Sequence, residues 1–186
     1  DLARIRLSGW HTDDSYFEVP AKATLLQALA VPKTGGETRF CNTRKAYEDL
    51  SDEQRMRLNR LQAVHGYDTM RARARAQARS EVEKQETPDV AHPLVRTHEE
   101  TGKKAIYFNS NRTDSIIGMQ RDESDPLLDW IHQHITQAQY RYDHSWRIGD
   151  ILLWDNRCLV HSVNVDFPVG ERRLHQRILL KGERPV

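Results

Sequence analysis

The chain has 186 residues, of which 38% are hydrophobic and 30% are charged. This length suits one domain with its own core, and no apolar run approaches the roughly 20 residues of a membrane-spanning helix. The 28 Lys and Arg residues against 27 Asp and Glu residues give a formal net charge of +1, which excludes a chain-wide basic surface for nucleic acid. The two cysteines, Cys41 and Cys158, exclude a disulfide framework and favour a reducing compartment.

The first half of the chain predicts short strands and short helices. Strands are expected at residues 23–31, 37–40 and 63–67. The first of these is a short apolar run, which is also compatible with a buried helix. Asn42 or Thr43 can cap one short helix, and Ser51 with Gln54 three residues later forms a capping box before a second helix.

An arginine-rich stretch interrupts this pattern in the middle of the chain. Arg71, Arg73, Arg75 and Arg79 are interleaved with alanines. One basic stretch in a chain that is otherwise close to neutral does not make a nucleic-acid surface. We therefore expect residues 69–88 to form a solvated insertion or a mobile lid.

The second half predicts more strands and one longer helix. A glycine-containing turn separates the expected strands at residues 93–97 and 105–109, which indicates a hairpin. Residues 122–134 predict a helix, with Ser124 as its cap and Pro126 in its first turn. Further strands are expected at residues 140–146, 151–154, 158–163 and 174–180. This pattern favours a mainly β fold with helical insertions, either a barrel or a jelly roll.

The pair His11 and Asp13 is a candidate for metal binding. In extended backbone, residues two apart point to the same side, so an imidazole and a carboxylate would meet. A third ligand from a facing strand would complete the two-histidine, one-carboxylate set that suits non-haem Fe(II). Taken alone, the two-residue pattern is more often a hydrogen-bonded surface or core pair.

A second candidate is the alternating set Arg173, His175 and Arg177, which would share one face of a strand. Two guanidinium groups on the inner face of a barrel need anionic partners, and arginine suits bidentate binding of a carboxylate or sulfonate. The alternative is an edge strand whose charges are solvated.

Taken together, these motifs resemble the taurine dioxygenase / 2,4-dichlorophenoxyacetate dioxygenase family of Fe(II)- and 2-oxoglutarate-dependent oxygenases. They occur in family order from Trp10 nearly to the C-terminus: W-H-T-D at 10–13, T-G-G-E-T at 34–38, H-P-L-V-R-T-H at 92–98, W-D-N-R at 154–157 followed by His161, and R-R at 172–173 followed by Arg177. The resemblance implies a double-stranded β-helix, a cupin-like jelly roll with the metal at one mouth.

The resemblance also implies roles for individual residues. His11, Asp13 and His161 match the family's iron ligands. Thr38 and Arg173 match the pair that binds the distal carboxylate of 2-oxoglutarate. Arg177 matches the position that holds the anionic group of the substrate.

The implied activity is that of a dioxygenase. With Fe(II), 2-oxoglutarate and O₂, it would hydroxylate a small anionic organic substrate (a sulfonate, phenoxyalkanoate or other carboxylate) and release succinate and CO₂. Arg112 lies where the sulfonate-using relative has an aromatic residue, so we expect it to bind a more polar or more anionic substrate. The alternative function is a catalytically silent jelly-roll module that binds a metal or another ligand, but such a module does not need Thr38 and Arg173.

Expectations for the whole chain follow from the same resemblance. It begins almost at the first residue, whereas family members carry a substantial section before the His-x-Asp motif. We therefore expect residues 1–186 to be a single oxygenase domain that lacks its N-terminal section. We also expect a cytoplasmic homo-oligomer that binds neither nucleic acid nor a membrane.

Overall fold

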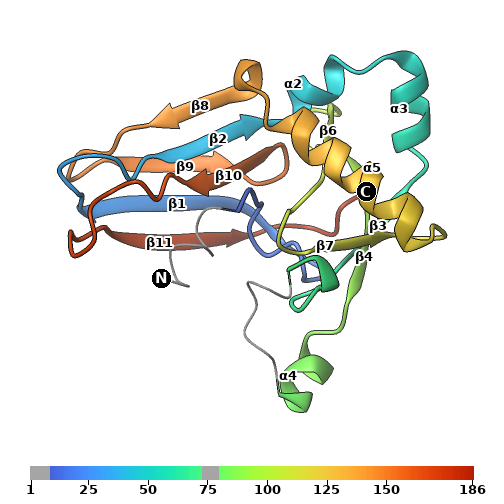
Figure 1. Ribbon diagram of the computed structural model, residues 1–186, viewed down its shortest axis with the longest axis horizontal. Helices are drawn as coiled ribbons and strands as arrows, with labels where there is room; N and C mark the ends of the chain where they lie inside the picture. Colours follow the sequence, from blue (N-terminus) through green and yellow to red (C-terminus); the bar gives the residue numbers. More distant parts are fainter. Residues whose placement is uncertain (1–8, 73–79) are drawn as a thin grey trace.

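Two three-stranded antiparallel sheets face each other in the computed structural model, which describes residues 9–72 and 80–186 (Figure 1). The strand order is β11–β1–β9 in the first sheet and β10–β2–β8 in the second. The strands are β1 (Ala21–Ala30), β2 (Thr38–Asn42), β8 (Arg141–His144), β9 (Ile151–Asp155), β10 (Leu159–Val163) and β11 (Leu174–Lys181). Neighbouring strands come from distant parts of the sequence, as a jelly roll requires.

The inner faces of these two sheets meet through aromatic rings but also carry buried polar groups. Phe40 on β2 and Trp154 on β9 lie edge to face, with ring centroids 5.3 Å apart. Thr24 is opposite Trp154 in the sheet register, so both side chains point to this interior. Thr24, Thr38 and His161 are all buried. The space between the sheets is therefore lined by groups that can bind a polar ligand.

The remaining elements lie at the other end of the molecule (Figure 1). A third sheet has the order β4–β3–β7, and β5 pairs with β6 in a hairpin. These strands are β3 (Gln62–His65), β4 (Val90–Pro93), β5 (Val95–Thr97), β6 (Lys104–Ile106) and β7 (Thr113–Ile116). The helices are α2 (Thr43–Glu48), α3 (Asp52–Leu58), α4 (Glu81–Glu86) and α5 (Arg121–Ile135), with short 3₁₀ turns η1 (Met70–Ala72) and η2 (Ala138–Tyr140).

The main apolar core lies between α5, α2 and the smaller sheets, away from the polar interior. The stripe predicted on α5 is buried, with Leu128, Ile131 and Ile135 fully covered. These side chains pack in one cluster with Ala46 and Ile116. Apolar burial therefore stabilises this end of the molecule, whereas buried polar side chains lie between the larger sheets.

Several local predictions are confirmed. Asn42 caps α2 by accepting a hydrogen bond from the Lys45 backbone N–H. Ser51 and Gln54 form the expected capping box at the start of α3. The predicted hairpin is present as β5 and β6, and the predicted mainly β architecture with helical insertions is also present.

The predicted helix at residues 122–134 is present as α5, but its predicted cap, Ser124, was wrong. The helix begins at Arg121 after Gln120, so Ser124 lies inside it and Pro126 falls in its second turn. The Ser124 hydroxyl instead accepts a hydrogen bond from the buried Ile116 N–H at 2.8 Å. Ser124 thus satisfies a backbone donor at the end of β7, a strand that the sequence patterns did not indicate.

The predicted insertion or lid at residues 69–88 falls partly outside the described residues, because these exclude 73–79. On the described N-terminal side, Arg71 forms ion pairs with Asp125, at 2.9 Å, and with Asp129, both on α5. Within the described parts of the chain, every helix is too short or too polar to cross a membrane.

Candidate metal centre

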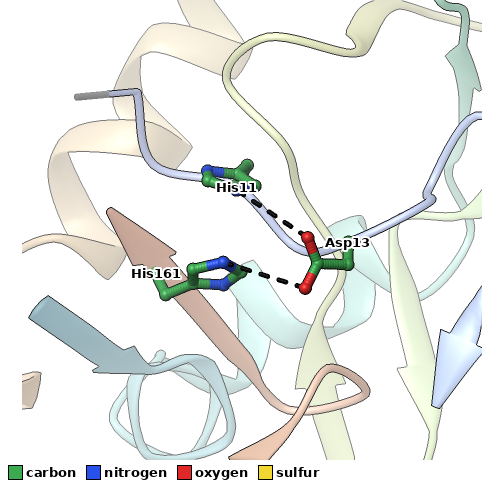
Figure 2. Close-up of side chains that lie close together, drawn as sticks. All are labelled: His11, Asp13 and His161. Carbon is green, nitrogen blue, oxygen red and sulfur yellow. Dashed lines mark ion pairs between the residues drawn. The ribbon is translucent and has the colours of Figure 1, made fainter. Parts of the chain in front are cut away.

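His11, Asp13 and His161 point toward one another at the edge of the polar interior (Figure 2). His11 and His161 form an isolated antiparallel bridge, in which each backbone N–H donates to the other's carbonyl, at 2.9 and 2.7 Å. This bridge places the two imidazole centroids 4.1 Å apart. One potential ligand atom from each of the three residues lies within 4.8 Å of the others. The expected ligand set is therefore brought together by backbone pairing of segments 150 residues apart in sequence, from 11 to 161.

Hydrogen bonds orient two of these side chains toward a common point. His11 Nδ1 lies 2.8 Å from the Gly9 carbonyl, so Nδ1 donates there and Nε2 keeps a free lone pair. The Thr24 hydroxyl donates to Asp13 Oδ2 at 2.6 Å. The Nε2 atoms of His11 and His161 lie 3.9 and 3.8 Å from the Asp13 carboxylate. These separations exceed hydrogen-bond length, so the three side chains face a common point without bonding directly to one another.

The charges of the site also fit a divalent cation. Burial raises the pKa of Asp13, but His161, His11, the Thr24 hydroxyl and Arg177 together hold it below its ordinary value. Burial is the largest cause that lowers the pKa of His161, to about 3. At neutral pH the site thus offers a carboxylate and a neutral His161 imidazole, which is the protonation state that metal ligation requires.

A second set of residues holds the Asp13 carboxylate in place. The Asn156 side chain donates to the Thr24 hydroxyl at 2.8 Å and accepts from the Trp154 indole at 3.0 Å. The Thr12 hydroxyl donates to the Asn156 carbonyl at 2.7 Å. Sequence reasoning gave no role to Thr24 or Asn156. The W-D-N motif was a signal for Asn156, and a polar residue within the apolar run 23–31 was the only signal for Thr24.

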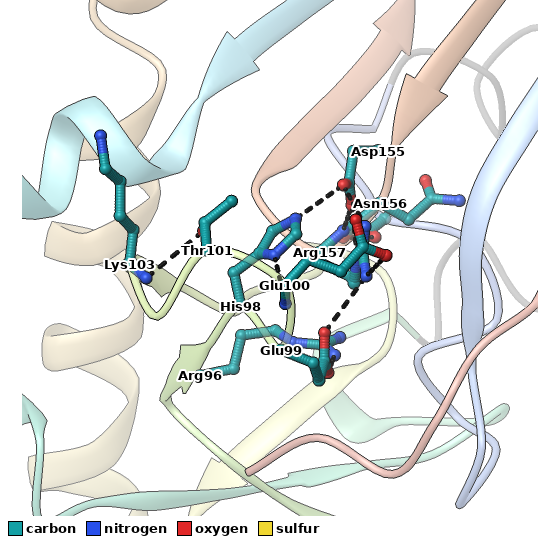
Figure 3. Close-up of polar contacts among 10 residues, drawn as sticks. Arg96, His98, Glu99, Glu100, Thr101, Lys103, Asp155, Asn156 and Arg157 are labelled. Atoms are coloured by element: carbon teal, nitrogen blue, oxygen red, sulfur yellow. Dashed lines mark hydrogen bonds and ion pairs between the residues drawn. The ribbon is translucent and has the colours of Figure 1, made fainter.

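The turn that carries Asn156 is itself anchored by an ion-pair network (Figure 3). The Arg157 guanidinium donates two hydrogen bonds to the Asp155 carboxylate, at 2.9 and 2.7 Å, and its backbone N–H donates a third at 2.8 Å. It also reaches Glu99 and Glu100 in the β5–β6 turn, at 3.3 and 3.1 Å. His98 contacts Asp155 at 2.9 Å. The hairpin therefore fixes the β9–β10 turn that supports the metal centre.

The predicted carboxylate-binding pair is also assembled. Arg173 donates to the Thr38 hydroxyl at 3.0 Å and to the Gly36 carbonyl at 2.9 Å. Gly36 has φ +75, and a Cβ there would lie 2.9 Å from Pro32 and 3.4 Å from Arg173, so glycine permits this close approach. Burial lowers the pKa of Arg173 to about 10, which leaves its guanidinium charged at neutral pH.

The two predicted substrate-binding arginines have different surroundings. Arg177 is 55% exposed, and its Nη1 lies 3.6 Å from Asp13 Oδ1. Arg112 donates to the Tyr67 carbonyl, and its guanidinium lies over the rings of Tyr67 and Tyr16, at 4.0 and 5.0 Å. Burial is the main cause of a raised pKa at Tyr16, on which both guanidinium groups also act. Arg112 is thus oriented by aromatic rings near the metal centre, and Arg177 is directly beside it.

Comparison with known proteins links this geometry to one family. Residues 3–179 match the family described as "Taurine catabolism dioxygenase TauD, TfdA family". A 2,4-dichlorophenoxyacetate dioxygenase of Burkholderia sp. (strain RASC), named as alpha-ketoglutarate-dependent, is 34% identical over 94% of this chain and 58% of its own length. A sulfate ester dioxygenase of Pseudomonas putida, also named as alpha-ketoglutarate-dependent, is 30% identical over 97% of this chain and 62% of its own length.

Solved structures give the same relationship. AAD-2 in complex with Mn(II) and N-oxalylglycine superposes with a TM-score of 0.90 at 33% identity, over 99% of this chain and 72% of AAD-2. A taurine dioxygenase from Burkholderia xenovorans superposes with a TM-score of 0.83 at 31% identity, over 97% of this chain and 59% of its own. The chain spans 53% to 58% of the two 2,4-dichlorophenoxyacetate dioxygenases it matches. The predicted jelly roll and family are confirmed: the chain belongs to the TauD, TfdA family of dioxygenases.

Proposed function

We propose that this chain forms the catalytic part of an Fe(II)- and 2-oxoglutarate-dependent dioxygenase. The reaction hydroxylates a small anionic organic substrate and releases succinate and CO₂. One observation carries the proposal: a two-histidine, one-carboxylate cluster and an Arg173–Thr38 pair are present in the same polar interior. The first suits Fe(II), and the second suits the distal carboxylate of a dicarboxylic cosubstrate.

His11, Asp13 and His161 hold Fe(II) in this proposal. When bound, the iron couples oxidative decarboxylation of 2-oxoglutarate by O₂ to hydroxylation of a substrate C–H bond. The protein leaves coordination positions open for this purpose, because three residues occupy one face of the ion. Arg173 provides charge-assisted hydrogen bonds to the cosubstrate's distal carboxylate, and Thr38 adds a neutral one.

Arg177 and Arg112 are the proposed substrate-binding residues. Arg177 reaches the metal centre, where it contacts Asp13. In the complex, Arg177 would bind the anionic group of the substrate in place of Asp13. Arg112 adds a second positive charge beside Tyr16. The relatives act, by their names, on a phenoxyacetate and on sulfate esters. We therefore propose a sulfonate, phenoxyalkanoate or other carboxylate as the substrate.

Arg173 distinguishes this proposal from the alternative of a catalytically silent metal-binding module. A module that binds only a metal does not need a buried guanidinium paired with a hydroxyl, since burying a charge without a ligand is costly. Arg173 and Thr38 therefore favour catalysis over silent binding. A cytoplasmic homo-oligomer without nucleic-acid or membrane contacts stays a prediction, as does a single domain over residues 1–186.

A substrate panel tests this proposal. Fe(II)-loaded protein is given 2-oxoglutarate, O₂ and either 2,4-dichlorophenoxyacetate, an alkyl sulfonate or an alkyl sulfate ester. We expect at least one compound to stimulate succinate release. Arg177→Met should raise the KM for that compound about tenfold or more, since a charge-assisted contact is lost. Arg112→Phe should change the order of preference among the compounds.

The matched control is Arg172→Met. Arg172 is an exposed arginine just before β11 and lies outside the site. This variant should behave as the wild type. Equal succinate release with and without every compound would reject the proposed substrate class. An unchanged order of preference in Arg112→Phe would reject the role of Arg112.

A further inference from the structure

His175 lies between the two proposed anion-binding arginines and has no role in the function proposed so far. It is opposite Ala28 in the β1–β11 register, and Arg177 is opposite Leu26. Because these positions are two apart, both side chains point to the polar interior. His175 therefore lies on the inner face of β11, between Arg173 at the carboxylate pair and Arg177 at the metal centre.

The His175 imidazole has no hydrogen-bond partner among the described residues, 9–72 and 80–186. Both ring nitrogens are buried and make no hydrogen bond. A buried polar atom without a partner costs free energy, and a neutral imidazole always has one donor and one acceptor to satisfy. An oxygen atom of a bound ligand could accept a hydrogen bond from the His175 ring on the inner face of β11.

Trp146 ties His175 to the carboxylate pair. The indole Nε1 donates to the Thr38 hydroxyl at 2.9 Å, and its ring lies edge-on to His175 with centroids 4.5 Å apart. Arg173 donates to the same Thr38 hydroxyl. One side chain therefore contacts both Thr38 and His175, which places the imidazole beside the Arg173–Thr38 pair.

The charges around His175 favour an anionic ligand. Burial, with a smaller contribution from Arg173, lowers the pKa of His175 to about 4. On the far side of Trp146, His144 contacts Asp150 at 3.2 Å, and that carboxylate also accepts from the Arg147 backbone at 2.8 Å. From β1, the facing residue is the uncharged Ala28. Arg173 and Arg177 are the charged neighbours on its own segment.

We infer that His175 is a further cosubstrate-binding residue, which donates a hydrogen bond to bound 2-oxoglutarate beside Arg173 and takes up a proton when this dicarboxylate binds. The inference rests on the proposed function. The arriving carboxylate offsets the repulsion from Arg173 and gives the imidazole an acceptor, so the complex holds the proton to a higher pH than the free protein does. Affinity for 2-oxoglutarate is then highest at low pH and falls as the pH rises through the pKa of the complex.

Calorimetric titration of Mn(II)-loaded full chain with 2-oxoglutarate, between about pH 5.5 and 8, tests this inference. The wild-type Kd should rise with pH. His175→Gln keeps a donor but does not titrate, so its Kd should stay nearly constant with pH. His175→Leu should weaken binding about tenfold at the low end of this range, as expected for one lost hydrogen bond to a charged group. Mn(II) affinity should be unchanged in both variants.

Two further variants define the limits of this experiment. Arg173→Leu should weaken binding at every pH, and the exposed Arg172→Leu should keep the wild-type Kd and its pH dependence. If His175→Leu and His175→Gln both keep the wild-type Kd and pH dependence, His175 only packs against Trp146 and the inference is wrong. If the wild type itself does not bind 2-oxoglutarate, the proposed function fails, and this inference fails with it.

Discussion

Asp13 carries a negative charge although its side chain is only 6% exposed. Its charge persists because two imidazoles, a hydroxyl and Arg177 surround it. The next residue, Asp14, adopts the left-handed backbone conformation with φ 58, which is uncommon for a residue other than glycine. Such a conformation next to a ligand is typical of sites where geometry is held by the surrounding structure.

His65 is a buried histidine outside the site, and unlike Asp13 it stays uncharged at neutral pH. It is 0% exposed, its ring stacks on Tyr107, and neither of its nitrogens has a hydrogen-bond partner in the described part of the chain. Burial, and to a lesser degree His92, lowers its pKa from 6.5 to about 3. The unfolded chain binds a proton below about pH 6.5, whereas the folded chain does not until about pH 3. His65 therefore destabilises the folded chain progressively as the pH falls through this window, and this penalty is absent above about pH 6.5.

His65→Phe should reduce this acid sensitivity. On going from pH 7 to 5, the wild type should lose about 2 kcal/mol of unfolding free energy through His65 alone, a loss that phenylalanine cannot show. Urea denaturation at the two pH values measures the difference. An equal loss in the wild type and His65→Phe would show that His65 is not the cause.

Single residues were the most predictable level of this protein. His11, Asp13, His161, Thr38 and Arg173 come together as their motifs indicated. The supporting residues Thr24 and Asn156 were not predicted, because a hydrogen bond across 132 positions leaves no local pattern in one sequence. Arg112 was predicted to bind the substrate, and this role stays a prediction. Its contacts with Tyr67 and Tyr16 were not predicted, because the three residues lie in separate segments of the sequence.

At the scale of elements, the β5–β6 hairpin holds the β9–β10 turn through Arg157 (Figure 3). Arg157→Leu should leave Asp155 and Glu99 without their shared cation. We expect a loss of about 3 kcal/mol in unfolding free energy, which is the lower end of the range for breaking a buried ion pair. The lower end applies because one of the partners, Glu100, is 66% exposed and keeps its solvation. Mn(II) affinity should also fall, since the Asn156 turn would move.

Urea denaturation and Mn(II) titration measure the two effects of Arg157→Leu. The exposed Arg60→Leu variant is the control and should change neither quantity by a measurable amount. A loss below about 1 kcal/mol in Arg157→Leu would mean that the network is a solvated surface cluster.

Element boundaries were less predictable than element types. The capping box before α3 was readable because both partners lie within four residues. The cap of α5 was not predictable in this way. The Ser124 hydroxyl accepts a hydrogen bond from the backbone N–H of Ile116 on β7, a partner that no local pattern indicates. Strand β7 has the sequence TDSI, whose polar residues give no apolar alternation, so only its pairing with β3 defines it.

For the whole molecule, apolar packing and chemistry are separated in space. The core around α5 and α2 is an apolar cluster, whereas buried polar groups lie between the two larger sheets. The many short strands predicted a mainly β fold, either a barrel or a jelly roll, and the family resemblance selected the jelly roll. Its strand order was not predictable, because pairings such as β1 with β11 join segments that are distant in sequence and carry no local signal of each other.

The central claim is that His11, Asp13 and His161 hold Fe(II) together with 2-oxoglutarate. Anaerobic titration of the Fe(II)-loaded protein with 2-oxoglutarate tests it directly, because a chelate of Fe(II) with a 2-oxo acid has a weak visible charge-transfer band. We predict this band for the wild type and its loss in His161→Ala. No band in the wild type, or an undiminished band in His161→Ala, would contradict the account.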